Sequence, residues 1–284
     1  LILQWAHHHL VPTTSNQYPV VQVTSFGPTG LVILHLLSEL HLFKDVPVIT
    51  MDTLHLFPES YDFYKTIQLY YTSKSNHMNL FITKPAIESR EEFDKEYGST
   101  LWKNDVKKLT KLTKIDPLNK VLDKYHTTMW ITGRRRSSGG ERSTMDVLEF
   151  EYFDNDNEDE DIDKSDYPFD TRRGRWKLNP LTYWTYNQVW EYIRKHKLPY
   201  NALYDKGYTS LGDEMTTGLP QLNATSISGD EFERSGRFIG MKNKECGLHN
   251  HRQKIKAKKQ LAEENGEEFT VPTLVCDKCI DLNV

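Results

Sequence analysis

Short apolar runs alternate with segments of helical length over the first half of the chain. The runs are residues 19–24, 47–51, 79–82 and 128–132. Apolar and β-branched residues at consecutive positions are typical of strands that are buried on both faces. The segments between them, such as 31–42 and 59–71, are long enough for helices. The alternation predicts right-handed crossovers and therefore an α/β fold, with an open, mainly parallel sheet flanked by helices.

The pattern is less regular in the second half. Residues 147–153 are expected to form a fifth strand, whereas the basic segment 97–117 is expected to be a loop. Thr185 and Gln188 fit a capping box, which predicts a helix after them. Residues 207–240 are rich in Gly, Ser and Thr and poor in apolar side chains, so we expect a mobile arm.

Composition limits the kind of partner and the compartment. The chain has 284 residues, 37% of them hydrophobic, with a mean hydropathy of -0.65 and a formal net charge of -4. The negative charge disfavours a nucleic-acid partner, and no apolar run is long enough to span a membrane. The start of the chain carries no secretory signal pattern. Three cysteines make no secreted disulfide framework, so we expect a reducing, cytoplasmic environment.

An acidic block accounts for the negative charge. Residues 154–166 are dominated by Asp and Glu and are predicted to form a disordered surface insertion that extends to about residue 170. A calcium site is the alternative, but the block lacks the turn glycine and the closing glutamate of an EF-hand.

A small-residue loop separates the first predicted strand from the first long helix. It contains Ser25, Gly27, Thr29 and Gly30. A strand followed by such a loop and a helix aims backbone N–H groups at an anion, and the two hydroxyls add donors. A simple strand-to-helix turn is the alternative. The loop is not a Walker A motif, because no Gly-Lys-Ser/Thr follows.

Polar residues also follow the second predicted strand. Asp52 and Thr53 stand at its carboxyl end, the end that faces the ligand crevice of an open α/β sheet. Asp52 could bind a ribose hydroxyl or an adenine edge, or it could cap a helix.

The fourth predicted strand runs into a cluster of cations. Gly133 is followed by Arg134, Arg135 and Arg136. Guanidinium groups bind phosphate and sulfate in bidentate fashion, so the turn predicts an anion site. RNA contact is a weaker interpretation, because no aromatic stacking pattern lies beside the arginines. Lys114 precedes a predicted helix start and is a further anion ligand, or else a solvated lysine.

Cys246 is the first cysteine of the chain and lies among charged residues. Arg234 and Arg237 precede it, and His249 follows it. Nearby cations lower the pKa of a thiol and so favour the nucleophilic thiolate. The alternative is an inert cysteine that packs as a small hydrophobe.

Several of these motifs together resemble one family, the phosphoadenosine phosphosulfate (PAPS) reductases of assimilatory sulfate reduction. The matching segments are residues 25–27, 52–53, 56–59, 97–98, 101–102, 114–119, 133–136, 180–181, 184–185 and 245–249. The Glu-Cys-Gly-Leu-His sequence at 245–249 is the most specific of them. The resemblance covers about residues 1–250. It implies an adenine-nucleotide α-hydrolase-like domain over residues 1–222, and a mobile C-terminal arm over 223–284 that carries the nucleophile.

The resemblance also implies a reaction. The Cys246 thiolate would attack the sulfonyl sulfur of PAPS, releasing adenosine 3′,5′-bisphosphate and leaving an S-sulfocysteine. Reduced thioredoxin or glutaredoxin would then release sulfite, and the family implies a homodimer. His249 would tune the site or donate a proton. The residues implied in substrate binding are Ser25, Gly27, Thr29, Gly30, Asp52, Thr53, Lys114, Gly133, Arg134, Arg135, Arg136, Arg234, Arg237 and His249.

The cysteine positions bear on the choice of substrate. A related group reduces adenosine phosphosulfate (APS) and holds an iron–sulfur cluster with a Cys-Cys pair and a Cys-x-x-Cys within the core. Residues 1–245 contain no cysteine, which argues against that cluster and favours PAPS, with no bound cofactor or metal. Cys276 and Cys279 stay open between a resolving dithiol, half of a zinc site and an incidental pair.

Three other functions remain as alternatives. One is an enzyme that resembles the adenylyl-sulfate (APS) reductases but lacks their cluster. An adenylating ligase of the same fold would need a Ser-Gly-Gly-x-Asp-Ser loop, which residues 25–30 do not match. A non-catalytic adenine-nucleotide sensor would keep the arginine turn but would have no need of a reactive thiol.

Overall fold

The structure is a computed structural model of the chain. It describes residues 1–284 except 11–16, 74–76, 153–173, 221–231 and 240–284. The predicted acidic insertion and most of the predicted C-terminal arm therefore lie outside the described residues, and the division of the chain at residue 222 stays a prediction.

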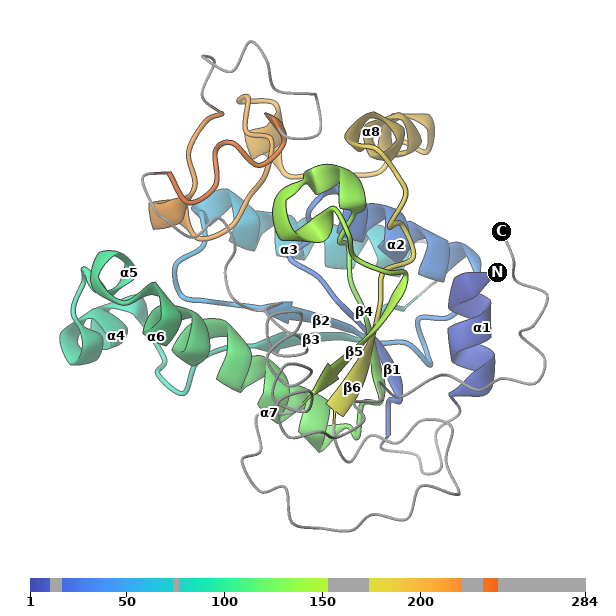
Figure 1. The fold of residues 1–284 in the computed structure, drawn as a ribbon, viewed down its shortest axis with the longest axis horizontal. Helices are drawn as coiled ribbons and strands as arrows, with labels where there is room; N and C mark the ends of the chain where they lie inside the picture. The colour runs from blue at the N-terminus through green and yellow to red at the C-terminus, as the bar shows by residue number, and fades with distance from the viewer. Residues whose placement is uncertain (11–16, 74–76, 153–173, 221–231, 240–284) are drawn as a thin grey trace, which may run out of the picture.

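The described residues form a six-stranded sheet (Figure 1). Its strands are β1 (Val20–Val23), β2 (Val48–Met51), β3 (Leu80–Thr83), β4 (Met129–Ile131), β5 (Leu148–Tyr152) and β6 (Gly174–Leu178). Their order is β3-β2-β1-β4-β6-β5. All neighbouring strands are parallel except β5 and β6, which pair antiparallel. The predicted open, mainly parallel α/β fold is confirmed.

Helices cover both faces of this sheet. They are α1 (Ile2–His9), α2 (Pro28–Glu39), α3 (Pro58–Ser73), α4 (Arg90–Tyr97), α5 (Leu101–Asn104), α6 (Val106–Thr110), α7 (Asp116–Lys124) and α8 (Tyr186–Lys195). Figure 1 shows α2 and α3 on one side of the sheet and α6 and α7 on the other. The predicted capping box at the start of α8 is present.

Adjacent residues of the central strands point to opposite cores. Val20 and Met129 belong to the core that α2, α3 and α8 complete. Val21 and Trp130 belong to the core that includes Leu118 of α7. Because side chains alternate across a strand, a sheet covered on both faces needs an apolar residue at every position. This requirement explains why the central strands are mostly apolar; the exception in β1, Gln22, is buried and donates to the Gly30 carbonyl at 2.9 Å.

The expectation of a loop over residues 97–117 is wrong. The segment contains α5, α6 and a π-helical turn, η1 (Lys111–Ile115). The Asp105 side chain caps α6 by accepting a hydrogen bond from the Lys108 N–H at 2.9 Å. Leu101 and Leu109 pack with Phe93 in a small core. These widely spaced apolar residues are hidden among lysines, so the sequence pattern does not show the helices.

Strand β6 was not predicted, because charged residues stand at two of its positions. Arg175 and Lys177 are both buried. Arg175 pairs with Asp123, and Lys177 lies 3.1 Å from a carboxylate oxygen of Glu151. Charges can be buried in this way when each has a partner of opposite sign, and a hydropathy pattern does not reveal such pairing.

The chain after residue 207 is also more ordered than expected. Residues 207–220 contain the short helix η5 (Glu214–Thr216), and Asp213 and Thr216 are buried. A β-bridge joins Thr217 to Arg237. The prediction of a mobile arm is therefore wrong for residues 207–220, which pack onto the α/β domain.

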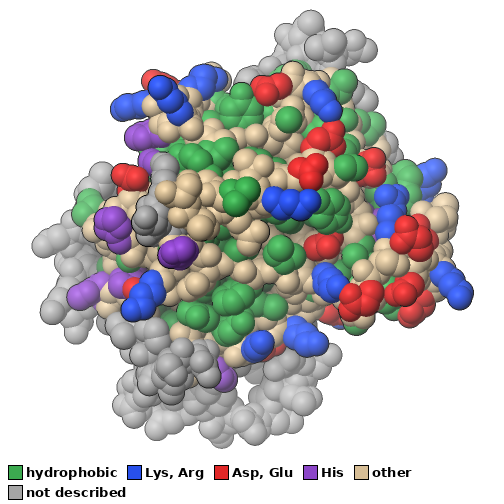
Figure 2. All heavy atoms as spheres, turned by 180° about the vertical axis from the view of Figure 1, so that it is seen from behind, with side chains coloured by type: hydrophobic (Ala, Val, Ile, Leu, Met, Phe, Trp, Pro, Cys, Tyr) green, Lys and Arg blue, Asp and Glu red, His purple; other side chains and the backbone are tan. Residues whose placement is uncertain are grey.

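The described surface is mixed in character. On the face that Figure 2 shows, acidic and basic side chains are interspersed and apolar ones lie among them. Among the described helices, none is both long and apolar enough to span a bilayer.

Candidate active site

The loop after β1 leads directly into the N-terminus of α2. The Phe26 N–H donates to the Thr24 hydroxyl at 2.9 Å, and Phe26 has a φ of 53°, which is uncommon for a residue other than glycine. Ser25 is exposed, and α2 begins after Gly27 with Pro28 in its first turn. The first N–H groups of a helix have no acceptor within it, so this turn offers donors and a partial positive charge to an anion.

Two glycines allow close packing around the loop after β1. A Cβ on Gly30 would lie 2.2 Å from Oγ1 of Thr24, and a Cβ on Gly133 would lie 3.1 Å from the backbone nitrogen of Gly30. A side chain on Gly30 would collide within the loop after β1, whereas one on Gly133 would push the loops after β4 and β1 apart. Gly133 therefore allows the arginine turn to approach the predicted anion loop.

Arg135 connects the arginine turn to the first turn of α2. Its side chain is 1% exposed, and its Nε donates to Oγ1 of Thr29 at 3.0 Å. Its terminal nitrogens donate to the Trp184 carbonyl at 3.2 Å and to the Glu233 carboxylate at 2.5 Å. The Ser138 hydroxyl donates to the same carboxylate at 3.2 Å. Arg135 thus holds an anionic group close to Thr29.

The neighbouring arginines point elsewhere. Arg134 donates to Glu149 on β5 at 2.7 Å, and both side chains are 5% exposed. The Asn179 amide also donates to Glu149, at 3.0 Å. Arg136 is half-buried and donates to the carbonyl of Met145 at 2.6 Å. Arg135, the middle arginine of the three, thus contacts the first turn of α2, whereas Arg134 and Arg136 donate to Glu149 and to the Met145 carbonyl.

Asp52 organises the turn after β2. One of its carboxylate oxygens accepts from the Leu54 N–H at 2.9 Å and from the Tyr61 hydroxyl at 2.8 Å. Leu54 has a φ of 63°. Burial and the hydrogen bond to Asp52 raise the pKa of the Tyr61 phenol, so this hydroxyl is a donor at neutral pH. Asp52 thus acts as a turn cap, and its half-buried carboxylate stays within reach of a ligand at the sheet edge.

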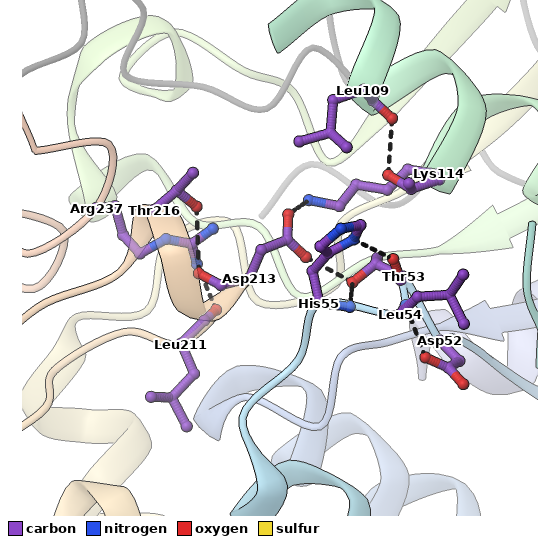
Figure 3. Close-up of polar contacts among 11 residues, drawn as sticks. Asp52, Thr53, Leu54, His55, Leu109, Lys114, Leu211, Asp213, Thr216 and Arg237 are labelled. Carbon is purple, nitrogen blue, oxygen red and sulfur yellow. Dashed lines mark hydrogen bonds and ion pairs between the residues drawn. The ribbon is translucent and has the colours of Figure 1, made fainter. Parts of the chain in front are cut away.

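Thr53 and Lys114 meet at a carboxylate that the sequence pattern did not single out (Figure 3). The Thr53 hydroxyl donates to Asp213 at 2.7 Å, and Nζ of Lys114 donates to it at 2.5 Å. Burial by itself raises the pKa of the Asp213 carboxyl. The Lys114 charge, the two hydrogen bonds and the more distant Arg237 charge outweigh burial, so the pKa is lowered and the group stays ionised.

Arg237 lies close to the cluster of Thr53, Lys114 and Asp213 (Figure 3). Its guanidinium donates to the Leu211 carbonyl, lies 5.1 Å from the centre of the Phe238 ring and occupies the space that a Cβ on Gly212 would need. Arg234 is half-buried, and its carbonyl accepts from the Arg237 N–H at 2.9 Å. Two of the predicted cations thus belong to one turn that packs against residues 211–217.

Cys246 and His249 lie outside the described residues, so their predicted roles stay predictions. Within the described part of the chain, no group of three or more His, Cys, Asp and Glu side chains is placed to hold a metal ion. The described site combines hydroxyls, backbone donors and buried cations that hold the carboxylates of Asp213 and Glu233, and donors of this kind can also hold an anionic ligand.

Sequence reasoning missed Asp213 and Glu233. Each stands in a polar segment where a carboxylate attracts no attention. A signal did exist in the cations themselves: Arg135, after a core strand, and Lys114, in the turn η1, are both buried, and buried cations need counter-charges. Residues 211–239 supply two of them.

Comparisons with known proteins identify the family of the chain. The model of the phosphoadenosine phosphosulfate reductase domain matches residues 19–219. A phosphoadenosine phosphosulfate reductase of Emericella nidulans is 36% identical over 82% of this chain and 67% of its own length. An adenosine 5′-phosphosulfate reductase of Oceanobacillus iheyensis is 35% identical over 87% of this chain and 86% of its own length.

A solved structure gives the same result. The phosphate complex of phosphoadenylyl-sulfate (PAPS) reductase from Candida auris has a TM-score of 0.57 and 32% identity, and the match covers 76% of this chain and 88% of that one. The domain match, the relatives and the shared fold establish that the chain belongs to the phosphoadenosine phosphosulfate reductase family of oxidoreductases.

Proposed function

We propose that this chain reduces 3′-phosphoadenylyl sulfate to sulfite and adenosine 3′,5′-bisphosphate. The observation that carries the proposal is the contact of Arg135 with Thr29 at the N-terminus of α2, where the guanidinium holds a carboxylate at 2.5 Å. A guanidinium that holds a carboxylate beside a helix N-terminus can hold a phosphate or a sulfonate in the same way. Thr53 and Lys114 supply further donors at the same edge of the sheet.

The chemistry is assigned to Cys246. Its thiolate attacks the sulfonyl sulfur, the bond from that sulfur to the bridging oxygen breaks, and adenosine 3′,5′-bisphosphate leaves with the bonding electrons. The product is an S-sulfocysteine on the enzyme. Nucleophilic catalysis of this kind divides one difficult reduction into two displacements. Arg234 and Arg237 precede Cys246 in the chain and would neutralise the charge that accumulates on the leaving group.

A dithiol protein completes the reaction, with reduced thioredoxin or glutaredoxin as the co-substrate. One of its thiolates attacks the Cys246 sulfur and displaces sulfite. A mixed disulfide between the dithiol protein and Cys246 is left. Its second thiol resolves that disulfide, so the two electrons come from the dithiol and Cys246 is regenerated. We further propose a cytoplasmic homodimer that carries no iron–sulfur cluster.

The absence of cysteine from residues 1–245 favours PAPS over APS, because the cluster of the APS-reducing group needs four cysteine ligands. Reduction of APS is the second candidate, since relatives with that name match the chain over most of its length. Sulfite production from each nucleotide, measured with reduced thioredoxin, separates the two. Faster turnover of APS, or bound iron and acid-labile sulfide in the purified protein, would refute the choice of PAPS.

The intermediate can be detected directly. After mixing with PAPS alone, the intact protein should gain the mass of one sulfonate, and peptide mapping should place it on Cys246. Cys246→Ser should abolish both the adduct and sulfite production while nucleotide binding survives. Cys276→Ser is the matched control and should still form the adduct. Tight binding of PAPS without any adduct on the unmodified chain would instead favour the nucleotide sensor.

A further inference from the structure

Asp213 joins segments that are far apart in the sequence. Its carboxylate accepts hydrogen bonds from Thr53, in the turn after β2, and from Lys114, in the π-helical turn η1. Its backbone forms a β-bridge with Leu56. Figure 3 shows Thr53 and Lys114 directed toward Asp213 from different elements, with Arg237 close by. One carboxylate therefore contacts two of the predicted substrate-binding side chains.

Burial of the Asp213 carboxylate carries a free-energy cost, because the charge loses its hydration. Asp213 is 4% exposed, and the side chain of its partner Lys114 is 11% exposed. The desolvation of a buried ion pair can exceed its Coulombic attraction, so such a pair is weak evidence for stability. A different role for the pair is to fix the position of its members.

The position of Lys114 supports that role. Lys114 lies in a π-helical turn of five residues, and such turns are rare and occur frequently at functional sites. An ammonium has three N–H groups, and the hydrogen bond to Asp213 uses one of them. A lysine held at one N–H group can present the others to an anion with less loss of side-chain entropy than a solvated lysine.

We propose that Asp213 is a positioning residue, which holds the Lys114 ammonium and the Thr53 hydroxyl in place to receive the sulfonate of the substrate. The inference rests on the proposed function, because it assigns these donors to the transferred group. Asp213 itself touches no substrate atom; it acts through Lys114 and Thr53.

The chain contains a matched control for the ion pair. Lys111 and Asp116 belong to the same part of the chain and also lie 2.5 Å apart, but their side chains are 65% and 48% exposed. Asp116→Asn removes an exposed carboxylate from this neighbouring pair. Asp213→Asn removes the buried charge while keeping an oxygen that can accept from Thr53.

The first measurement is the single-turnover rate of sulfonate transfer from saturating PAPS to Cys246. We expect Asp213→Asn to slow it by about tenfold or more, because small misplacements of a positioned group cost up to about a hundredfold. Affinity for adenosine 3′,5′-bisphosphate, which lacks the sulfonate, should change less than about threefold, a range that covers ordinary context effects on binding. Asp116→Asn should change neither quantity.

A double-mutant cycle separates positioning from folding. If Asp213 acts through Lys114, then Asp213→Asn combined with Lys114→Met should be no slower than Lys114→Met alone. Additive losses would overturn the proposal, as would an Asp213→Asn variant that is less stable to urea but transfers the sulfonate at the original rate. Should Asp213→Asn fail to fold, Asp213→Glu keeps the charge but moves the carboxylate, and an unchanged transfer rate in that variant would also overturn it.

Inorganic sulfate provides a test that does not depend on turnover. Asp213→Asn should weaken sulfate binding measured by calorimetry, and Asp116→Asn should not. If the unmodified chain forms no adduct, the proposed function fails, and sulfate binding still decides the positioning role. Equal sulfate affinity in the unmodified chain and Asp213→Asn would refute that role on its own.

Discussion

Replacement of Gly30 by alanine tests the close contact on which the anion loop depends. Gly30 lies in the first turn of α2 and has no positive φ, so it is needed for space rather than for backbone freedom. An added Cβ would lie 2.2 Å from Oγ1 of Thr24. Thr24 is 6% exposed, and its hydroxyl accepts the Phe26 N–H at 2.9 Å. The methyl group must therefore displace a buried hydroxyl that holds the loop.

The expected cost follows from three terms. Overpacking costs about 1–3 kcal/mol, and loss of the hydrogen bond to Phe26 costs about 0.5–1.5 kcal/mol. Alanine gains up to about 1 kcal/mol over glycine in a helix. With the full alanine gain, these terms sum to about 0.5–3.5 kcal/mol. We therefore expect Gly30→Ala to lower the free energy of unfolding by about this amount in urea titrations, and to weaken binding of inorganic phosphate.

A second variant makes this reasoning refutable. Thr24→Ala removes the atom with which the new Cβ collides, so the two substitutions together should cost less than the sum of their separate effects by about 1 kcal/mol or more. Strictly additive costs would show that the collision is not the cause. A Gly30→Ala variant as stable as the unmodified chain would show that the loop relaxes freely.

Three further predictions concern the buried charges. The pKa of Asp213 is lowered on folding, so its ionisation stabilises the fold above its unfolded pKa, and that contribution is lost as the pH falls. The difference in unfolding free energy between the unmodified chain and Asp213→Asn should therefore shrink in acid. A difference that stays constant with pH would contradict this. Glu149→Gln leaves Arg134 buried without its carboxylate and should cost about 3–5 kcal/mol in urea, so a cost below about 1 kcal/mol would be inconsistent with burial of the pair. Glu233→Gln frees Arg135 from an anionic partner and should raise affinity for inorganic phosphate several-fold in calorimetry, whereas weaker binding would mean that Glu233 helps to form the site.

The sequence was informative where burial alone decides the structure. The central strands are mostly apolar on both faces because helices cover both faces of the sheet. The sequence was misleading where ion pairs between distant residues decide the structure. β6 buries Arg175 and Lys177, which neutralise carboxylates on Asp123 and Glu151. Hydropathy treats such residues as exposed, since the partners are distant in the sequence.

The same limit applies to the three consecutive arginines. They are adjacent and chemically identical, and the sequence predicted one role for all of them. Their directions differ because their partners differ: Arg134 pairs with Glu149 at 2.7 Å, and Arg135 with Glu233 at 2.5 Å. Residue type and adjacency therefore identified the turn as a cluster of cations, but not which of its members contacts the first turn of α2.

The buried cations of the site differ in where their carboxylate partners lie in the chain, and this bears on what each cation can do. Glu149 belongs to β5, so an anion that displaced it from Arg134 would break the ion pair that joins the arginine turn to the sheet. Asp213 and Glu233 belong instead to the segments that lead toward Cys246 in the chain. In the proposed function, an anionic substrate would compete with Glu233 for Arg135, because Glu233 is bound through the side chains of Arg135 and Ser138. The cations whose counter-charges lie on the segments before Cys246 are therefore the ones through which substrate binding and the placement of Cys246 can be coupled.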